Sequence, residues 1–266
     1  VIQKGVFSVD LHITSRENER VKWLCRLRDS ASFRQREQCY LAEGLRLCRD
    51  IAHVQQPVEL YYTEKAMMQH PELVEMGGRH ICISDGVADK ISDTKNPQGI
   101  FGVFGQNIQT LDRLCSSGRW LILEHLQDPA NIGALLRSAA AFGFDGVVFC
   151  ADCADPYSPK AVRASMGMLT RLKLAKADTV AQTSRWLKKE HVPLVAAALY
   201  HSVPLDQAES WRGQNVALLI GNEGNGLSEG AVKVADIAVR IPMANGVESL
   251  NAAVAGSVLL WHFRGV

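Results

Sequence analysis

The sequence predicts an α/β protein of two domains, and three observations support this prediction. A chain of 266 residues with 47% apolar content can form two medium globular cores. Beyond residue 118, continuous apolar runs alternate with amphipathic segments, as in a parallel sheet covered by helices on both faces. A polar stretch separates this region from a less regular N-terminal part. We therefore divide the chain into a domain at 1–105, a linker at 106–117 and a domain at 118–266.

The N-terminal domain begins with helical periodicity. Apolar positions between Ser15 and His53 recur at helical spacing and predict two helices, with a break at Ser30-Ala31-Ser32. Short strands and helices then alternate, which predicts a small α/β domain. The predicted strands are Val58 to Thr63, His80 to Ile83 and Gly99 to Phe104, and the predicted helices are Glu64 to Glu75 and Asp85 to Ser92.

The alternation in the C-terminal domain is regular. Its predicted strands are 120–124, 146–150, 172–175, 193–198, 216–220 and 237–240, and its predicted helices are 131–142, 159–165, 179–190, 228–235 and 250–263. From periodicity alone we expect an ordinary doubly wound sheet, because protein chains almost never form knots.

Charge is distributed unevenly along the chain. The net charge is only +1, so no overall basic field indicates a nucleic-acid partner. Between Arg16 and Arg49, however, nine Lys or Arg residues face five acids, and eight of the nine are arginine, which suits bidentate phosphate contact. This segment predicts a phosphate-binding surface, and the alternative is an amphipathic helix with a solvated basic face. The candidate phosphate-binding residues are Arg26, Arg28, Arg34 and Arg36.

Cysteine usage and hydropathy indicate the compartment. Seven cysteines without even spacing do not form a disulfide pattern, and no apolar N-terminal segment suggests secretion, so we expect a reducing cytoplasm. Cys150 and Cys153 have C-x-x-C spacing but no partner pair, which favours a buried structural role, and we predict no metal site. No apolar run approaches the ~20 residues that span a bilayer, so we expect no membrane partner.

Three blocks in the C-terminal domain have the composition of a ligand pocket. They are Leu121 to Gly143, Leu218 to Ser228 and Ile241 to Asn251, and each combines an apolar run with glycine and a few polar side chains. Glycine lets the main chain approach a ligand closely. The pattern from Gly221 to Gly226 is G-x-x-G-x-G, and Ile241 stands where a ribose-binding acid would follow, which argues against a nicotinamide cofactor.

These three blocks, in this order, resemble the motifs of the SpoU (TrmH-like) branch of the SPOUT RNA methyltransferases. The resemblance is strong from Trp120 to Phe263. It is weaker in the N-terminal domain, through Phe33, Leu41 to Gly44 and Asn96 to Ile100. It implies a SPOUT domain with a parallel sheet and a deep trefoil knot, preceded by a small ribosomal-protein-like domain that binds the substrate.

The resemblance also implies an activity. Members of this branch transfer a methyl group from S-adenosyl-L-methionine to a ribose 2′-hydroxyl of rRNA or tRNA, and they dimerise through the C-terminal domain. We therefore expect a homodimeric methyltransferase acting on RNA, with rRNA favoured over tRNA. The alternatives are a tRNA enzyme, a base methyltransferase, a catalytically silent RNA-binding assembly factor of the same fold, and a dinucleotide-dependent oxidoreductase.

Site residues follow from the motifs position by position. The cofactor residues that the resemblance implies are Leu219, Gly221, Gly226, Ile241, Met243 and Leu250, and the catalytic ones are Asn131, Arg137, Glu223, Ser249 and Asn251. Arg137 would bind RNA phosphate and help to remove the ribose proton, with Glu223 as the alternative base because a guanidinium hardly loses its proton.

Structural explanations remain open for several of these residues. Asn131 and Ser249 also suit helix N-caps. Arg137, in an apolar stretch, also suits a buried ion pair with Glu124 or Glu223. Ile241, Met243 and Leu250 also suit core packing.

One position departs from the third motif. Asn245 stands where glycine usually follows Ile-Pro-Met-x. We expect Gly246 to adopt the positive φ in its place.

Overall fold

The computed structural model describes residues 11–265, which form two compact units. Unit 1 extends to Gln106 and also includes Tyr157–Arg163, whereas unit 2 comprises Asn107–Pro156 and the chain from Ala164 onward. Within residues 11–265, no helix has the length and apolar character that crossing a membrane requires.

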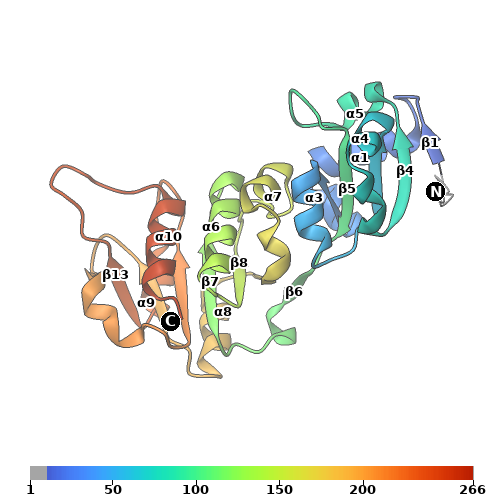
Figure 1. Cartoon of the computed structure of the whole chain (residues 1–266). Coiled ribbons are helices and arrows are strands. Elements are labelled where there is room, and N and C mark those ends of the chain that lie inside the picture. Colours follow the sequence, from blue (N-terminus) through green and yellow to red (C-terminus); the bar gives the residue numbers. More distant parts are fainter. Residues whose placement is uncertain (1–10, 266) are drawn as a thin grey trace. The chain divides into compact units, whose positions relative to one another are not determined.

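Unit 1 is built on a mixed five-stranded sheet with the strand order β1-β4-β3-β5-β2 (Figure 1). Strands β1, β4 and β3 pair in parallel, and β5 is antiparallel to both β3 and β2. The strands are β1 Leu11–Ile13, β2 Cys39–Glu43, β3 Glu59–Thr63, β4 Arg79–Ile83 and β5 Ile100–Gly105.

Helices flank this sheet. One core joins apolar side chains of α1, α2 and α5 to sheet residues such as Tyr61, Ile81 and Phe101. Most of these helices begin at a side-chain cap, such as Asn18 for α1 and Ser84 for α5, whereas α3 begins at Gly44 without one. The helices are α1 Glu19–Asp29, α2 Ala31–Glu37, α3 Leu45–Ala52, α4 Glu64–Gln69, the 3₁₀ helix η1 Pro71–Met76 and α5 Asp85–Ile91.

The prediction of two helices between Ser15 and His53 is wrong. Three helices lie there, with strand β2 between α2 and α3. The residues of Cys39–Glu43 are too few to show a period, and their extended conformation depends on antiparallel pairing with β5, which is distant in the sequence. Strand β1 was also not predicted, because it has only three residues and its extended conformation depends on pairing with β4.

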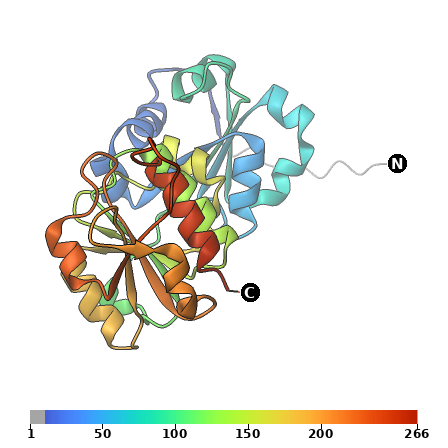
Figure 2. The same ribbon diagram turned by 90° about the vertical axis from the view of Figure 1, so that its left-hand side faces the viewer.

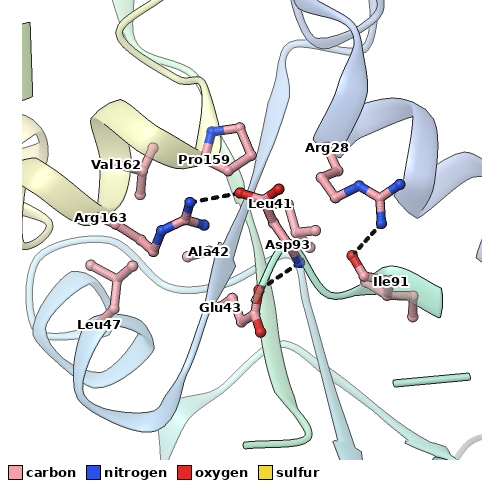
Figure 3. Close-up of a pocket in the computed structure, with 10 residues that line it drawn as sticks. All are labelled: Arg28, Leu41, Ala42, Glu43, Leu47, Ile91, Asp93, Pro159, Val162 and Arg163. Carbon is pink, nitrogen blue, oxygen red and sulfur yellow. Dashed lines mark hydrogen bonds and ion pairs between the residues drawn. The ribbon is translucent and has the colours of Figure 1, made fainter. Parts of the chain in front are cut away.

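Most of α7, Pro159–Ser165, folds with unit 1 although the sequence around it belongs to unit 2. The guanidinium of Arg163 lies 2.6 Å from a carboxylate oxygen of Asp93, and the Asp93 backbone N–H donates to Glu43 (Figure 3). Nearby, the rings of Tyr40 and Tyr157 lie 4.9 Å apart. An ion pair and an aromatic contact thus hold this segment in place.

Unit 2 contains an eight-stranded sheet with the order β11-β13-β10-β12-β7-β8-β9-β6, and every pairing in it is parallel. Its central strands are continuous apolar runs because both faces are covered. The strands are β6 Ile108–Thr110, β7 Arg119–Glu124, β8 Gly146–Cys150, β9 Lys173–Ala177, β10 Leu194–Ala197, β11 Val203–Pro204, β12 Val216–Ile220 and β13 Ile237–Arg240.

Two helix pairs cover this sheet. On one face, α8 and α9 pack over the core that contains Trp120 and Trp186. Elsewhere in unit 2, α10 lies beside α6, where a Cβ on Gly256 would come within 2.4 Å of the Leu135 side chain (Figure 2). The helices are η2 Leu111–Arg113, α6 Pro129–Ala141, η3 Met168–Arg171, α8 Val180–Lys188, η4 Leu205–Trp211, α9 Glu229–Val234 and α10 Ala252–His262.

The stretch 106–117, expected as a linker, contains β6 and η2. Strand β6 pairs with β9 at the edge of the sheet, so part of this polar stretch is ordered by its partner strand. The α/β fold with a small mixed-sheet domain and a parallel-sheet domain is confirmed. The trefoil knot stays a prediction.

Candidate functional site

Three loops of unit 2 leave the carboxyl ends of strands, two of them in the middle of the sheet and one nearer its edge. They follow β7, β12 and β13, and they contain the polar residues of the three sequence blocks. Strands β7 and β12 are neighbours, and the chain order reverses between them. In open α/β sheets, ligands bind outside the carboxyl ends of the strands at such a reversal.

A chain of hydrogen bonds joins the three loops. Glu223 accepts from the backbone N–H of Asp128 at 3.0 Å and from the Asn131 amide at 3.1 Å. Asn251 donates to the side-chain oxygen of Asn131, also at 3.1 Å. The loop after β12, the first turns of α6 and the start of α10 are therefore held together by three polar side chains.

The two amides in this chain have defined orientations. The Asn251 oxygen accepts from the backbone N–H groups of Ala253 and Val254, which are donors only, so its nitrogen must face Asn131. At the other end, the carboxylate of Glu223 can only accept when ionised, so the Asn131 nitrogen must face Glu223. A helix N-terminus and a carboxylate thus fix both amides.

Glu223 is held as a carboxylate. Burial acts to raise its pKa, but hydrogen bonds from the Asp128 backbone and the Asn131 amide outweigh burial and lower the pKa below its ordinary value of 4.5. A carboxylate with a lowered pKa is a weak proton acceptor. The arrangement therefore favours a positioning role for Glu223 over its predicted alternative role as general base.

The glycine loop after β12 is a tight turn closed on itself. Asn222 and Gly226 form an isolated antiparallel bridge, and the Asn222 side chain accepts from Gly224 and Asn225 and donates to the His125 carbonyl. A Cβ on Gly221 would lie 2.4 Å from the Gly226 backbone. Glycine at position 221 is therefore required by the loop itself, before any ligand is considered.

The segment between β13 and α10 leaves most of its backbone free. Among the described residues, the one hydrogen bond within 241–250 runs from the Val247 N–H to the Ala244 carbonyl. Gly246 has a φ of 87°, which confirms the expectation that it takes over the positive φ next to Asn245. Donors and acceptors of this segment remain available to a ligand.

The predicted cofactor residues lie around these two loops. Ile241 and Met243 are half-buried and Leu250 is 37% exposed, so core packing does not account for them fully. Leu219 is fully buried in β12 and belongs to the core of unit 2, so it exposes no side-chain surface to a ligand. A free backbone segment with apolar side chains, joined to the glycine turn through the hydrogen bonds of Glu223, Asn131 and Asn251, fits a nucleoside with an amino-acid tail, as in S-adenosylmethionine.

Arg137 is exposed on α6, and within residues 11–265 no described hydrogen bond or ion pair involves it. The buried ion pair with Glu124 or Glu223 is therefore wrong. Glu124 instead accepts from the N–H and hydroxyl of Ser228. The N–H donors of this exposed guanidinium are therefore available to bind an external anion.

The capping alternatives are also resolved. Asp128 caps α6, which begins at Pro129, so Asn131 is a buried residue of the first turns. Asn251 caps α10, so Ser249 is an exposed loop residue instead of a cap. Sequence reasoning did not identify the roles of Asp128 and Asn222. Asn222 lies two residues after the end of β12 and two before Gly224, a position typical of an Asx turn.

The four arginines predicted to bind phosphate fall into two pairs. Arg34 is buried and donates to the carbonyls of Leu27 and Arg28. Arg28 donates to three carbonyls from Lys90 to Ser92, one of them visible in Figure 3. Arg26 and Arg36 are exposed and cover the Phe33 ring at 4.0 and 4.5 Å. Two guanidiniums thus stabilise unit 1, and two remain accessible.

Cys150 and Cys153 have the predicted structural surroundings. Cys150 contacts the Thr183 hydroxyl, and Cys153 donates to the carbonyls of Leu123 and Cys150. Burial raises the pKa of Cys150 to about 12 and that of Cys153 to about 11, so both stay thiols at neutral pH.

Comparison with known proteins gives a consistent result. Residues 118–261 match the SpoU rRNA Methylase family, and residues 18–102 match the MRM3-like substrate binding domain. An uncharacterized tRNA/rRNA methyltransferase of Synechocystis is 31% identical over 95% of this chain and 93% of its own length. A 23S rRNA (guanosine(2553)-2′-O)-methyltransferase of Bacillus subtilis is 28% identical, over 73% and 76%. The AdoMet-bound rRNA methyltransferase of Sinorhizobium meliloti has a TM-score of 0.83 at 29% identity, covering 95% and 97%.

Proposed function

Because this chain belongs to the SpoU rRNA methylase family, we propose that its substrate is 23S rRNA and that its Glu223, Asn131 and Asn251 network holds the catalytic loops in register. The chain is an S-adenosylmethionine-dependent RNA 2′-O-methyltransferase. The preference for 23S rRNA is supported by the Bacillus subtilis relative, which acts on that RNA.

The hydrogen-bonded chain from Glu223 through Asn131 to Asn251 is the observation that supports these site assignments most directly. The cofactor supplies a methyl group on a sulfonium. We place it against the backbone of Gly221, Gly226 and the segment 241–250, with Ile241, Met243 and Leu250 as apolar walls. Fixing two loops relative to each other matters because attack geometry, once set, removes much of the entropic barrier.

Arg137 is assigned to the RNA. Its exposed guanidinium can form a bidentate contact with a phosphate next to the acceptor ribose. Such a contact would hold the acceptor 2′-hydroxyl in line with the methyl group that the bound cofactor would supply. Ser249, exposed in the loop before α10, is assigned to the same acceptor side.

Unit 1 is assigned to RNA selection. Its match to a substrate-binding domain supports this role, and the accessible pair Arg26 and Arg36 offers phosphate contacts. Phe33 beneath them is only 4% exposed, so it orders the guanidiniums and does not stack on a base.

We also assign a homodimer interface to unit 2. One side of α10 carries the exposed apolar residues Val254, Val258 and Trp261, which with Ala134 of α6 line a groove. Such a patch on a domain surface marks a partner site. The seven free thiols agree with the reducing cytoplasm that we propose as its compartment.

The decisive experiment measures transfer of labelled methyl from S-adenosylmethionine to 23S rRNA, 16S rRNA and tRNA, followed by mapping of the 2′-O-methylated ribose. We expect one modified nucleotide in 23S rRNA. Modification of tRNA alone would overturn the proposed substrate. Cofactor binding without transfer to any RNA would favour a silent assembly factor.

The interface is tested by light scattering. We expect a mass near twice 29.2 kDa for the wild-type chain, and a shift toward the monomer for Trp261→Glu. A wild-type protein that remains monomeric at micromolar concentration would contradict the interface.

A further inference from the structure

Three potential metal ligands converge in unit 1, whereas the loops assigned to methyl transfer belong to unit 2. The donor atoms of His12, Glu64 and Cys82 all lie within 4.8 Å of one another. Within residues 11–265, no other three His, Cys, Asp or Glu side chains come this close. The three come from β1, the start of α4 and β4, so no sequence spacing could have revealed them.

The sheet register places these side chains together. His12 is paired with Cys82 between β1 and β4, and Tyr62 is paired with Cys82 between β3 and β4. Paired residues of neighbouring strands point to the same face of a sheet. Glu64 follows Tyr62 by two positions, just past the end of β3. Packing of the opposite face, with Ile13, Ile81 and Ile83 in the core, fixes this register.

The three ligand residues also differ in their exposure to solvent. His12 and Glu64 are exposed and line an open pocket of about 640 Å³, whereas Cys82 is only 6% exposed. A cation that enters this pocket meets His12 and Glu64, whose donor atoms lie within 4.8 Å of the Cys82 sulfur.

The charge of the set also suits a cation, because the Glu64 carboxylate lies beside the Cys82 thiol. A divalent cation would neutralise Glu64 and deprotonate the coordinating thiol, which releases a proton to solvent.

We propose that His12, Glu64 and Cys82 form a zinc site with three protein ligands and a water in the fourth position. A set of one nitrogen, one oxygen and one sulfur donor suits zinc, whereas magnesium and calcium require oxygen donors. Zinc bonds of about 2.0–2.3 Å require the donors to come within about 4 Å of one another, which small side-chain rotations achieve. The bound ion would fasten the three-residue strand β1 to β4.

The test uses the full chain without a histidine tag, stripped of metal by a chelator and then titrated with Co²⁺, followed by Zn²⁺. We expect one Co²⁺ per chain, a thiolate-to-cobalt absorption band in the near ultraviolet, and loss of the band when Zn²⁺ displaces Co²⁺. Absence of the band, or of any metal bound more tightly than about 100 µM, would overturn the site.

Variants of the three proposed ligands test where the ion binds. Glu64→Gln and His12→Gln change exposed residues, and each should weaken metal affinity at least tenfold while the circular dichroism spectrum stays unchanged. Cys82→Ser should abolish the thiolate band. Cys115→Ser, at an exposed cysteine of unit 2, serves as the matched control and should behave as wild type. A band that survives Cys82→Ser and disappears in Cys115→Ser would overturn the proposal, as would unchanged affinity in both glutamine variants.

Discussion

The arginine-rich segment of unit 1 and the motif loops of unit 2 were both singled out by residue type, and the structure treats them differently. Arg28 and Arg34 direct their donors to backbone carbonyls inside unit 1. In unit 2, Asn131 and Asn251 bridge three loops, and Arg137 remains exposed. The difference lies in the surroundings: helix ends offer unpaired carbonyls that nearby arginines satisfy, whereas strand ends of a parallel sheet gather side chains at one edge.

The largest effect is expected at Arg137. Arg137→Ala should lower methyl transfer by about 10²-fold or more, because the acceptor loses its positioning contact, while the melting temperature and cofactor affinity stay nearly unchanged. Arg185→Ala, at an exposed arginine of α8, is the control and should be silent. A loss of stability in Arg137→Ala without a specific loss of turnover would return this residue to a structural role.

The glycine loop gives the next effect. Gly221→Ala should weaken S-adenosylmethionine binding and destabilise the protein by about 1–3 kcal/mol, because the new Cβ would overlap the Gly226 backbone. Calorimetry and thermal melting measure both quantities. Gly224→Ala lies in the same loop with only the Asn222 oxygen at 3.6 Å, and should change little. Equal effects of the two substitutions would remove the steric explanation.

The two arginine pairs of unit 1 should separate under mutation. Arg34→Ala should cost about 1–3 kcal/mol in unfolding free energy, since two buried carbonyls lose their donor. Arg26→Ala should leave stability unchanged and reduce the slope of log RNA affinity against log salt by about 0.7–0.9. Denaturant unfolding and salt-dependent RNA binding test the pair. Equal changes in stability and in salt slope in the two variants would contradict the division of these arginines into a structural and an RNA-binding pair.

The dual role of Asn251 allows a finer test. Asn251→Ala should lose a cap worth about 1 kcal/mol together with turnover. Asn251→Ser keeps an N-cap oxygen but loses the amide N–H that reaches Asn131, so its stability should recover while its turnover stays low. Recovery of both in the serine variant would show that the amide contact is dispensable.

The smallest effect concerns pH. Because the folded state lowers the pKa of Glu223 below 4.5, the stabilisation from its ionised form is complete above that value and is lost as the pH falls through the folded-state pKa. The melting temperatures of wild type and Glu223→Gln should therefore differ at neutral pH and converge in acid. The difference should be modest, since solvent screens this exposed carboxylate. A difference that stays constant over the whole acid range in which the protein remains folded would contradict the assignment.

Sequence reasoning succeeded best where a long hydrophobic period or a local backbone requirement of glycine determines the structure. The apolar strands of unit 2 and the positive φ near Asn245 followed from periodicity and from the needs of glycine turns. It failed where a short segment depends on a distant partner, as at β2 and β6. It also left open a buried ion pair for Arg137, because an apolar stretch in the sequence does not reveal which face of a helix meets solvent.

The sequence alone determined the family, the α/β class and the residue types at the methyl-transfer loops, because strand and helix periodicity and glycine chemistry are local properties. Only the tertiary structure decided which side chains meet. The contacts between Glu223, Asn131 and Asn251, the partners of Arg28 and Arg34, and the convergence of His12, Glu64 and Cys82 all join segments distant along the chain. Such contacts depend on strand register and helix packing, which the whole folded core fixes.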